Sequence, residues 1–218
     1  LAYSTVFTMI LLLSTSALYV LIKRTIADHI DSELNQSTTA VLNMVRTSAS
    51  VSIKNHLRAV AEKNREIALH YYKRATAGEI SMAEAKQRTR EVMLSQTIGK
   101  TGYIYCIDSQ GIATVHPRAR VEGNNWAHFD FVRRQMELKT RYIEYQWQNP
   151  GETAARPKAL YMVYFEPYDW IISVTSYRDE FRQILPMEEI RSSVKDLKFG
   201  YSGYVFVADR EGNIIIHP

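Results

Sequence analysis

A segment from the middle of the chain returns at its end, and this repeat constrains the fold more than any other feature. GKTGYIYCIDSQGIATVHP (99–117) aligns without a gap, 101 residues further on, with GYSGYVFVADREGNIIIHP (200–218). A repeat of this length is too long for a solenoid unit and fits a duplicated small domain. We therefore expect one module followed, at 199–218, by the first hairpin of a second, truncated module. The chain begins with Leu1 rather than Met, so we interpret it as a fragment.

The first 22 residues contain no charged side chain, and Lys23 and Arg24 follow them directly. At about 1.5 Å per residue they form a helix of roughly 33 Å, which is long enough for the hydrocarbon core of a bilayer. The segment SALYVLIK, which ends at Lys23, offers no small-x-small cleavage site, so we expect an uncleaved transmembrane anchor over 1–23. The two basic residues pull the side that follows toward the cytoplasm, and basic residues ahead of Leu1 would oppose them.

The next segment, 24–97, has a helical pattern. Residues 25–76 contain neither Pro nor Gly, and apolar residues recur there at spacings of three and four, which predicts a long amphipathic helix. We expect this helix to pack on its copy in a homodimer or on the domain that follows. Gly78 ends it, and Ser81 with Glu84 predicts a capping box at the start of a second helix.

From Gly99 onward the apolar period changes to two. Five β-rich runs are separated by turn residues, and a polar helical segment lies near 130–139. The runs are 103–107, 112–116, 142–147, 159–165 and 170–177. We predict an α+β module over 98–180, with a five-stranded antiparallel sheet flanked by helices, and a linker helix over 181–198.

Several functional classes find no support in the sequence. Cys106 is the only cysteine, so the chain has no internal disulfide, and its apolar neighbours predict a buried thiol. Asp108, Ser109 and His116 are triad residue types, but a turn explains the first two, and no P-loop, nucleophile elbow or metal-binding spacing is present. We expect no enzyme activity, cofactor or metal. The net charge of +4 suits acidic ligands, anionic lipid or nucleic acid, and the anchor disfavours nucleic acid.

Four motifs follow one another after the apolar segment: His116-Pro117, Tyr145-x-Trp147, Pro157-Lys158-x-x-Tyr161 and Tyr177-x-Asp179. Their order resembles the Cache sensor domains, which are PAS-like extracytoplasmic modules of bacterial chemoreceptors, sensor histidine kinases and cyclases. The resemblance covers about 30–185 and, with the second start at Gly200, is similar to double Cache receptors. It implies a sensor region on the periplasmic side of the plasma membrane, with the output domain outside this chain. The sequence Trp147-Gln148-Asn149-Pro150 departs from the Trp-Pro of many members.

The resemblance also implies a small ligand, often a carboxylate. Between 118 and 160 the chain has eight Lys and Arg residues against five Asp and Glu, which favours an anion. Lys158 is the candidate for the charge, Trp147 for a pocket wall and Tyr161 for a hydroxyl donor. In a regular strand Lys158 and Tyr161 point to opposite faces, so both reach one pocket only if Lys158 lies on the loop.

Three residues of the repeated hairpin complete the candidate site. Tyr103 and Tyr105 share one face of a strand, so they line the pocket together or lie in the core together. His116 recurs as His217, which favours a role in the fold, such as an imidazole bonded to backbone, over ligand contact.

The alternative to ligand sensing is a dimerising spacer or a docking site for a periplasmic binding protein. A closed cavity beside Lys158, Trp147 and Tyr161 would favour a small ligand, and a filled core with an exposed apolar patch would favour a protein partner.

Overall fold

The computed structural model describes residues 2–149, 151–184, 187–199, 203–209 and 211–218. These residues form two compact units, one of 48–185 and the other of 1–47 with 186–218. The candidate site lies in the first unit. Each unit is described by itself below.

The long helix predicted from the sequence is present as α1 (Ala2–Thr76). It ends at Gly78, whose φ of +79° is unfavourable for residues with a Cβ, and the Glu79 N–H closes the last turn on the Arg74 carbonyl at 3.0 Å. Helix α2 (Met82–Leu94) begins as predicted, with the Ser81 hydroxyl accepting the Glu84 N–H at 3.1 Å. The second half of the predicted capping box is wrong, because the Glu84 carboxylate pairs with Arg88 at 2.6 Å instead.

A five-stranded antiparallel sheet forms the centre of the 48–185 unit, as predicted. The strands are β1 (Tyr103–Ile107), β2 (Ala113–Val115), β3 (Arg141–Trp147), β4 (Arg156–Phe165) and β5 (Trp170–Tyr177). Their spatial order is β2-β1-β5-β4-β3. The first and last strands of this sheet along the chain, β1 and β5, are therefore neighbours. Helix α3 (Asp130–Leu138) makes the crossover from β2 to β3. Among the described residues, three short 3₁₀ helices connect these elements. They are η1 (Ala119–Val121) between β2 and α3, η2 (Glu166–Tyr168) between β4 and β5, and η3 (Arg178–Ile184) after β5.

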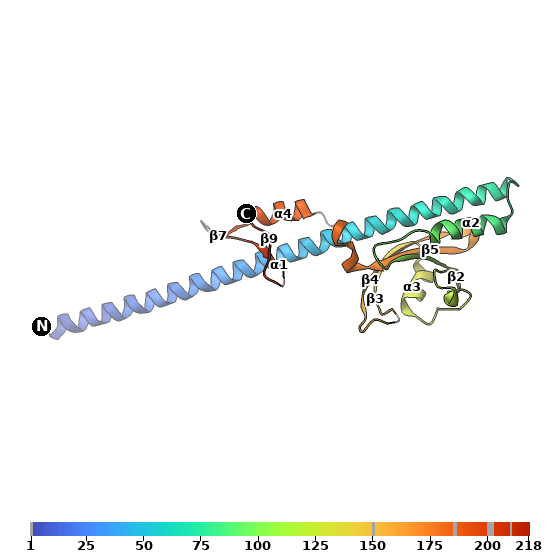
Figure 1. Cartoon of the computed structure of the whole chain (residues 1–218). Coiled ribbons are helices and arrows are strands. Elements are labelled where there is room, and N and C mark those ends of the chain that lie inside the picture. The colour runs from blue at the N-terminus through green and yellow to red at the C-terminus, as the bar shows by residue number, and fades with distance from the viewer. Residues whose placement is uncertain (1, 150, 185–186, 200–202, 210) are drawn as a thin grey trace. The chain divides into compact units, whose positions relative to one another are not determined.

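The two faces of this sheet carry separate hydrophobic layers. Figure 1 shows the helices that cover them, with α1 and α2 on one side of the sheet and α3 on the other. One face packs under the C-terminal half of α1 and under α2, through residues such as Leu57, Met93 and Cys106. The other face packs against α3 and the segment before it, through Tyr105, Val132 and Leu160. Because side chains alternate along a strand, β1, β3, β4 and β5 each supply residues to both layers.

The repeated sequence forms the same hairpin twice. In the first copy Cys106 pairs with Val115 and Ile107 with Ala113, with a bulge between the two pairs. In the second copy, β8 (Val207–Ala208) and β9 (Ile214–Ile216) repeat this register and its bulge. The turns also match, since Asp108 and Asp209 each accept two backbone N–H bonds and a glycine with φ near +85° follows three residues later. The second hairpin lies in the other unit with α4 (Met187–Lys195), β6 (Lys198–Phe199) and β7 (Gly203–Tyr204).

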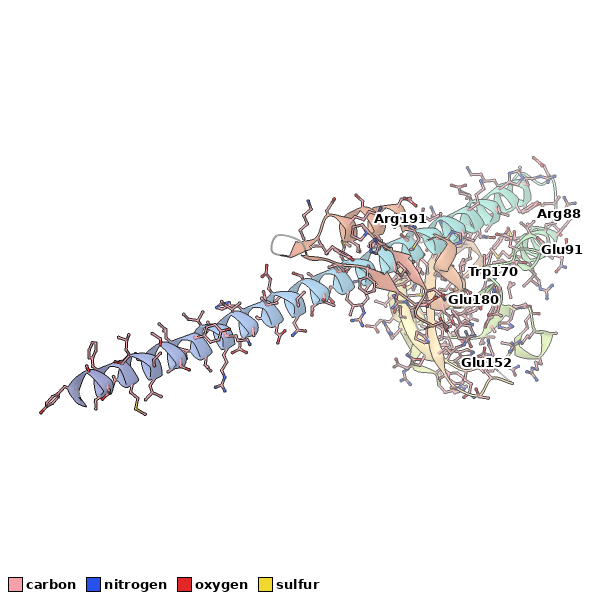
Figure 2. All side chains as sticks on the ribbon, turned by 60° about the vertical axis from the view of Figure 1, so that its left-hand side comes forward. Arg88, Glu91, Glu152, Trp170, Glu180 and Arg191 are labelled. Carbon is pink, nitrogen blue, oxygen red and sulfur yellow. The ribbon has the colours of Figure 1, made fainter. Side chains whose placement is uncertain are left out.

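The N-terminal part of α1 is a candidate membrane span. Its most apolar 18-residue window has a mean hydropathy of 2.1, and none of that window is buried. Figure 2 shows these side chains projecting from the helix, and among the described residues they remain exposed. Apolar side chains in such an arrangement require a hydrocarbon environment or another protein surface.

Candidate functional site

A cavity of about 330 Å³ opens on the sheet face that α3 covers. Its walls are mainly aromatic, and they come from β1, β3, α3 and the segment between β2 and α3. The aromatic lining residues are Tyr103, Tyr105, Trp126, Phe131, Tyr145 and Trp147. Smaller apolar residues fill the gaps between them: Ile107, Ala113, Val121 and Val132. The polar lining residues are His116, Arg118, Arg120 and Gln148.

Strand alternation explains why the tyrosines meet there. Tyr103 and Tyr105 are two residues apart on β1 and both face the cavity, which confirms that they share one environment. Tyr145 and Trp147 have the same relationship on β3. Two distant strands therefore each present a pair of rings to one space.

Lys158 lies next to this cavity, behind Tyr103. It sits within β4 rather than on the loop, opposite Tyr145 of β3 and Tyr177 of β5, and its side chain is 0% exposed. Its ammonium donates to the Tyr103 hydroxyl at 3.4 Å and lies 4.5 Å from the centre of that ring. Within the described part of the chain, no carboxylate forms an ion pair with it. Burial, and then the nearby charge of Arg118, lowers the pKa of Lys158 to about 8.

His116 reaches the cavity from the end of β2. Its Nδ1 accepts the Arg118 N–H at 3.0 Å, which places the proton of the neutral ring on Nε2. Burial lowers the pKa of His116 to about 4, so the ring is neutral at ordinary pH. Its ring centre is 5.1 Å from that of Tyr103. The expected backbone-bonded imidazole is therefore present, and the same side chain also lines the cavity.

The histidine–tyrosine contact recurs in the second hairpin. The centres of the His217 and Tyr204 rings are also 5.1 Å apart. The ring pair therefore belongs to the hairpin fold, and the first copy places it beside a cavity.

The deeper hydroxyl groups of the walls are bonded inside the protein. Tyr105 donates to Oε1 of the buried Gln135 at 3.0 Å, and Ser173 donates to the same oxygen at 2.7 Å. The Tyr145 hydroxyl lies 3.5 Å from that of Thr175. These residues present ring surface to the cavity and direct their polar atoms away from it.

Two of the six candidate residues are not part of the cavity lining: Lys158, which lies behind Tyr103, and Tyr161, which lies farther away. Tyr161 belongs to the hydrophobic cluster under α1 and α2, on the opposite face of the sheet from Lys158. Because Lys158 lies inside the strand, the three-residue spacing puts the two side chains on opposite faces.

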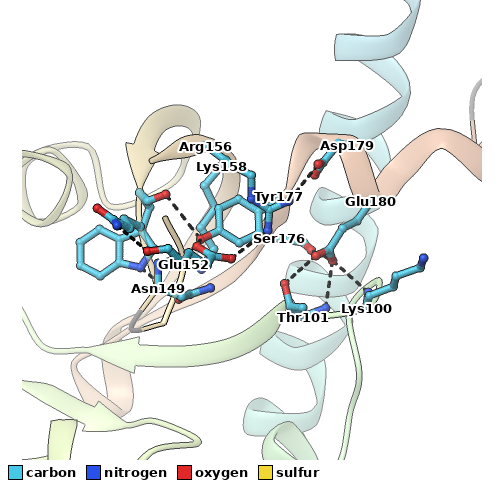
Figure 3. Close-up of polar contacts among 12 residues, drawn as sticks. Lys100, Thr101, Asn149, Glu152, Arg156, Lys158, Ser176, Tyr177, Asp179 and Glu180 are labelled. Carbon is cyan, nitrogen blue, oxygen red and sulfur yellow. Dashed lines mark hydrogen bonds and ion pairs between the residues drawn. The ribbon is translucent and has the colours of Figure 1, made fainter. Parts of the chain in front are cut away.

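The carboxylates of Glu152 and Glu180 form hydrogen bonds that connect the segments around the site (Figure 3). Glu152, in the β3–β4 loop, accepts the Tyr177 hydroxyl and pairs with Arg156 at 2.9 Å. Glu180, just after β5, accepts the backbone N–H groups of Lys100 and Thr101 at 2.9 and 3.0 Å. The entry to β1 and the exit from β5 are thereby joined.

The sequence did not predict ten of the fourteen described lining residues: Ile107, Ala113, Arg118, Arg120, Val121, Trp126, Phe131, Val132, Tyr145 and Gln148. Phe131 and Val132 are apolar residues of the amphipathic helix α3. Apolar residues in such a helix predict core packing, and nothing in the pattern distinguishes a residue that lines a pocket. Gln148 lies where the chain departs from the Trp-Pro pattern, and the departure brings a polar side chain to the cavity. Pro150 lies outside the described residues.

A long helix on one face of an antiparallel β2-β1-β5-β4-β3 sheet, with a small cavity on the other, defines a PAS-like sensor module. A family model described as a Cache domain matches residues 21–218, and the chain belongs to this family. Chains of this family are sensor domains of chemoreceptors and histidine kinases.

Individual relatives agree with this assignment. A sensor histidine kinase of Rhizobium johnstonii, MctS, is 26% identical over 106 residues, which make up 44% of this chain and 23% of that kinase. The periplasmic sensor domain of a chemotaxis protein superposes with a TM-score of 0.52 at 22% identity, covering 58% of this chain and 96% of that domain. A Cache chemosensory domain described for its recognition of carboxylic acids superposes with a TM-score of 0.50 at 19% identity, covering 56% and 91%. At these identities the structural likeness shows the fold.

Proposed function

We propose that this chain is the ligand-sensing region of a bacterial membrane receptor and that it binds a short carboxylic acid in the aromatic cavity. The observation that carries the proposal is the buried ammonium of Lys158, which has no carboxylate partner among the described residues. An unpaired buried charge is unfavourable, and an anion brought into the cavity would offset part of that cost. A structurally similar Cache domain that recognises carboxylic acids supports the same class of ligand.

The charge of Lys158 would act on the ligand through Tyr103. The ammonium donates to the Tyr103 oxygen, so the hydroxyl hydrogen of Tyr103 remains available for an acceptor in the cavity. The Nε2–H of His116 is a second donor in the same region. Trp147 and Tyr105 serve as walls. Tyr161 is left out of the proposed site because it lies on the other face.

Transmission is proposed to run through α1. Leu57 and Ala61 of this helix are fully buried against the sheet face opposite the cavity. A ligand that favours one arrangement of the strands would therefore shift the helix packed on them. The helix continues without a break into the candidate membrane span. The ligand must bind the two arrangements with different affinity, because equal affinity shifts no population.

The proposal includes insertion in the plasma membrane, with the sensor region on the periplasmic side, and pairing of two copies through α1. Ile26, Ile30 and Leu34 are exposed at spacings of four on this helix. Such a stripe suits contact with a second helix. Disulfide crosslinking through cysteines introduced along the stripe, at a periodicity of three to four, would support pairing, and uniform absence of crosslinks would contradict it.

The cavity supports a small ligand over a role as spacer or docking platform. A spacer would have a filled core at this position, whereas aromatic walls enclose about 330 Å³.

The test is calorimetric titration of the complete 218-residue chain, in lipid nanodiscs, with a panel of short carboxylic acids. We expect saturable binding of at least one acid and a loss of about tenfold or more in Lys158→Ala, since a charge-assisted contact contributes about 1.5–3 kcal/mol. Lys100→Ala is the matched control, because the Lys100 side chain is exposed. Absence of binding by every acid, or unchanged affinity in Lys158→Ala, would overturn the proposal.

A further inference from the structure

Carboxylic acids differ in the other groups that they carry, such as an ammonium group, a hydroxyl group or a second carboxylate. The lining of the cavity bears on which of these acids can bind. We infer that the site selects acids with a single carboxylate and an apolar body, and that it rejects amino acids and dicarboxylates. This inference rests on the proposed function and adds the chemical class of the ligand.

The first argument concerns the ammonium group of an amino acid. Among the described lining residues there is no Asp or Glu. Glu122 bonds to the His116 N–H at 2.7 Å and to Arg90 at 3.0 Å, and Glu152 is held by Tyr177 and Arg156. An ammonium group on the ligand would therefore lose its water and gain only contacts with ring faces, with no anion to pair with, so its desolvation would be compensated only in part.

The second argument concerns hydroxyl and carbonyl groups on the body of the ligand. The wall hydroxyls of Tyr105 and Tyr145 are bonded to Gln135 and Thr175. What the walls offer is the face of each ring, which favours CH₂ groups and other rings over polar atoms. A polar atom of the ligand that faces these rings would be left without a partner.

The third argument concerns a second carboxylate. The remaining cations of the lining, Arg118 and Arg120, are exposed to solvent. Ion pairs in water are weak, because both charges are well hydrated before they meet. Only the region of Lys158, Tyr103 and His116 combines burial with donors, so one carboxylate is stabilised strongly and a second is not.

The volume of the cavity limits the size of the apolar part of the ligand. A volume of about 330 Å³ holds roughly ten non-hydrogen atoms at about 30 Å³ each, the share that a water molecule has in the liquid. Acetate would leave most of the aromatic wall in contact with water. Each further CH₂ that reaches the wall strengthens binding by about 0.8 kcal/mol, or about fourfold. Affinity should therefore rise from acetate to butanoate to hexanoate.

A set of six-carbon compounds tests the inference in the nanodisc-bound chain, with empty nanodiscs as the blank. The set is hexanoate, hexanedioate, 2-aminohexanoate and hexanamide, which share a chain and differ in polar groups. We expect hexanoate to bind tightest and each of the other three to bind at least about tenfold more weakly.

A variant provides an independent check. Gln148 is exposed and lines the cavity, and its side-chain amide donates to the Glu152 carbonyl oxygen at 2.6 Å. Gln148→Glu adds a carboxylate to the lining and gives up that hydrogen bond at a position where water can replace it. This variant should bind hexanoate more weakly, and the difference in affinity between hexanoate and 2-aminohexanoate should become smaller. Gln146→Glu is the control, because Gln146 is exposed on β3, two residues before Gln148, and is not part of the cavity lining.

The outcomes separate this inference from the function on which it rests. If no acid binds, the proposed function fails. If hexanedioate or 2-aminohexanoate binds as tightly as hexanoate, and Lys158→Ala weakens them all, the proposed function stands and the inference about the apolar body is overturned. A flat series from acetate to hexanoate would also overturn the inference.

Discussion

The ammonium of Lys158 and the hydroxyl of Tyr103 are 3.4 Å apart in the interior of the sensor module, with the ring of Tyr103 at 4.5 Å. The contact joins β4 to β1 across β5, which lies between them. It is a weakly compensated buried charge next to a cavity. Protein interiors accommodate such a charge at a cost, and that cost is the basis of the first prediction.

Replacing Lys158 by Met should stabilise the ligand-free chain and weaken the binding of acids by about tenfold or more. Met has a similar length and no charge, so the substitution removes an unfavourable buried ammonium at little cost in packing. We expect a gain of about 1–3 kcal/mol, measured by denaturant unfolding of the chain without ligand. Lys100→Met, at an exposed position, should change stability by no more than about 0.5 kcal/mol. A destabilised Lys158→Met variant would show that the ammonium is well compensated in the free protein.

The pKa of Lys158, lowered to about 8 by burial, predicts opposite pH effects on binding and on stability. Above pH 8 the folded chain loses the ammonium, so affinity for an acid should fall by up to about tenfold per pH unit. Between pH 8 and the unfolded value near 10.4, the unfolded chain binds more protons, so the contribution of this group to stability should rise with pH. Calorimetry at pH 8 in buffers of different ionisation enthalpy should detect proton uptake on binding. Absence of uptake, with affinity constant from pH 7 to 9, would contradict the assignment.

Tyr103→Phe and Tyr105→Phe form a matched pair on one strand. The Tyr103 hydroxyl contacts Lys158 and is available to a ligand, whereas the Tyr105 hydroxyl bonds to Gln135. We expect Tyr103→Phe to reduce acid affinity by about tenfold, as for loss of a charge-assisted hydrogen bond. Tyr105→Phe should leave affinity within about threefold and lower stability by about 1 kcal/mol. Titration and denaturant unfolding of both variants measure the two effects separately, and the reverse pattern would exclude Tyr103 as the donor.

Gly102→Ala should destabilise the module more than Gly123→Ala. A Cβ at Gly102 would lie 2.4 Å from the Ile98 carbonyl oxygen and 2.5 Å from the Thr175 carbonyl oxygen, and backbone atoms cannot move away easily. Gly123 has φ +77° and open space around it, so Ala there adds only the strain of a left-handed backbone, about 1–2 kcal/mol. We expect Gly102→Ala to exceed that value in denaturant unfolding. Equal effects would show that β1 and β5 can separate at this point.

Glu180→Gln should loosen the junction between the entry to β1 and the exit from β5. Burial raises the pKa of Glu180, but hydrogen bonds from Ser176, Thr101 and Lys100 outweigh it, and the net pKa is lowered. The carboxylate therefore contributes stability above the unfolded value near 4.3 and loses it as the pH falls. We expect Glu180→Gln to lower the unfolding midpoint at pH 7 and to flatten the acid side of the stability profile. Glu137→Gln, at an exposed position, is the control, and identical profiles for the two variants would contradict the role.

Much of the fold could be predicted because its signals are local. Short β-rich runs bounded by turn residues, at 103–107 and 170–177, predicted two of the strands that form. Gly78 and Ser81 marked a helix end and a helix start through backbone geometry that depends on a few neighbouring residues. The repeat predicted two hairpins of one type, and the register and turn are the same in both.

The candidate site was only partly predictable, for a reason that Lys158 and Tyr161 show. The sequence placed them in one motif, and alternation alone indicated that they could not both reach a pocket from within a regular strand. Where the strand begins decides the matter, and pairing with β3 and β5 starts it before Lys158.

The sequence by itself determined the elements, the duplicated hairpin and the apolar N-terminal helix, because periodicity, capping and turn chemistry act over a few residues. Only the tertiary structure decided that Tyr103 and Tyr145 meet at one cavity and that Lys158 is buried behind Tyr103, with no carboxylate paired to it among the described residues. Burial of a charge depends on every segment packed around it, and those segments are brought together by the order of strands in the sheet, which no local pattern encodes.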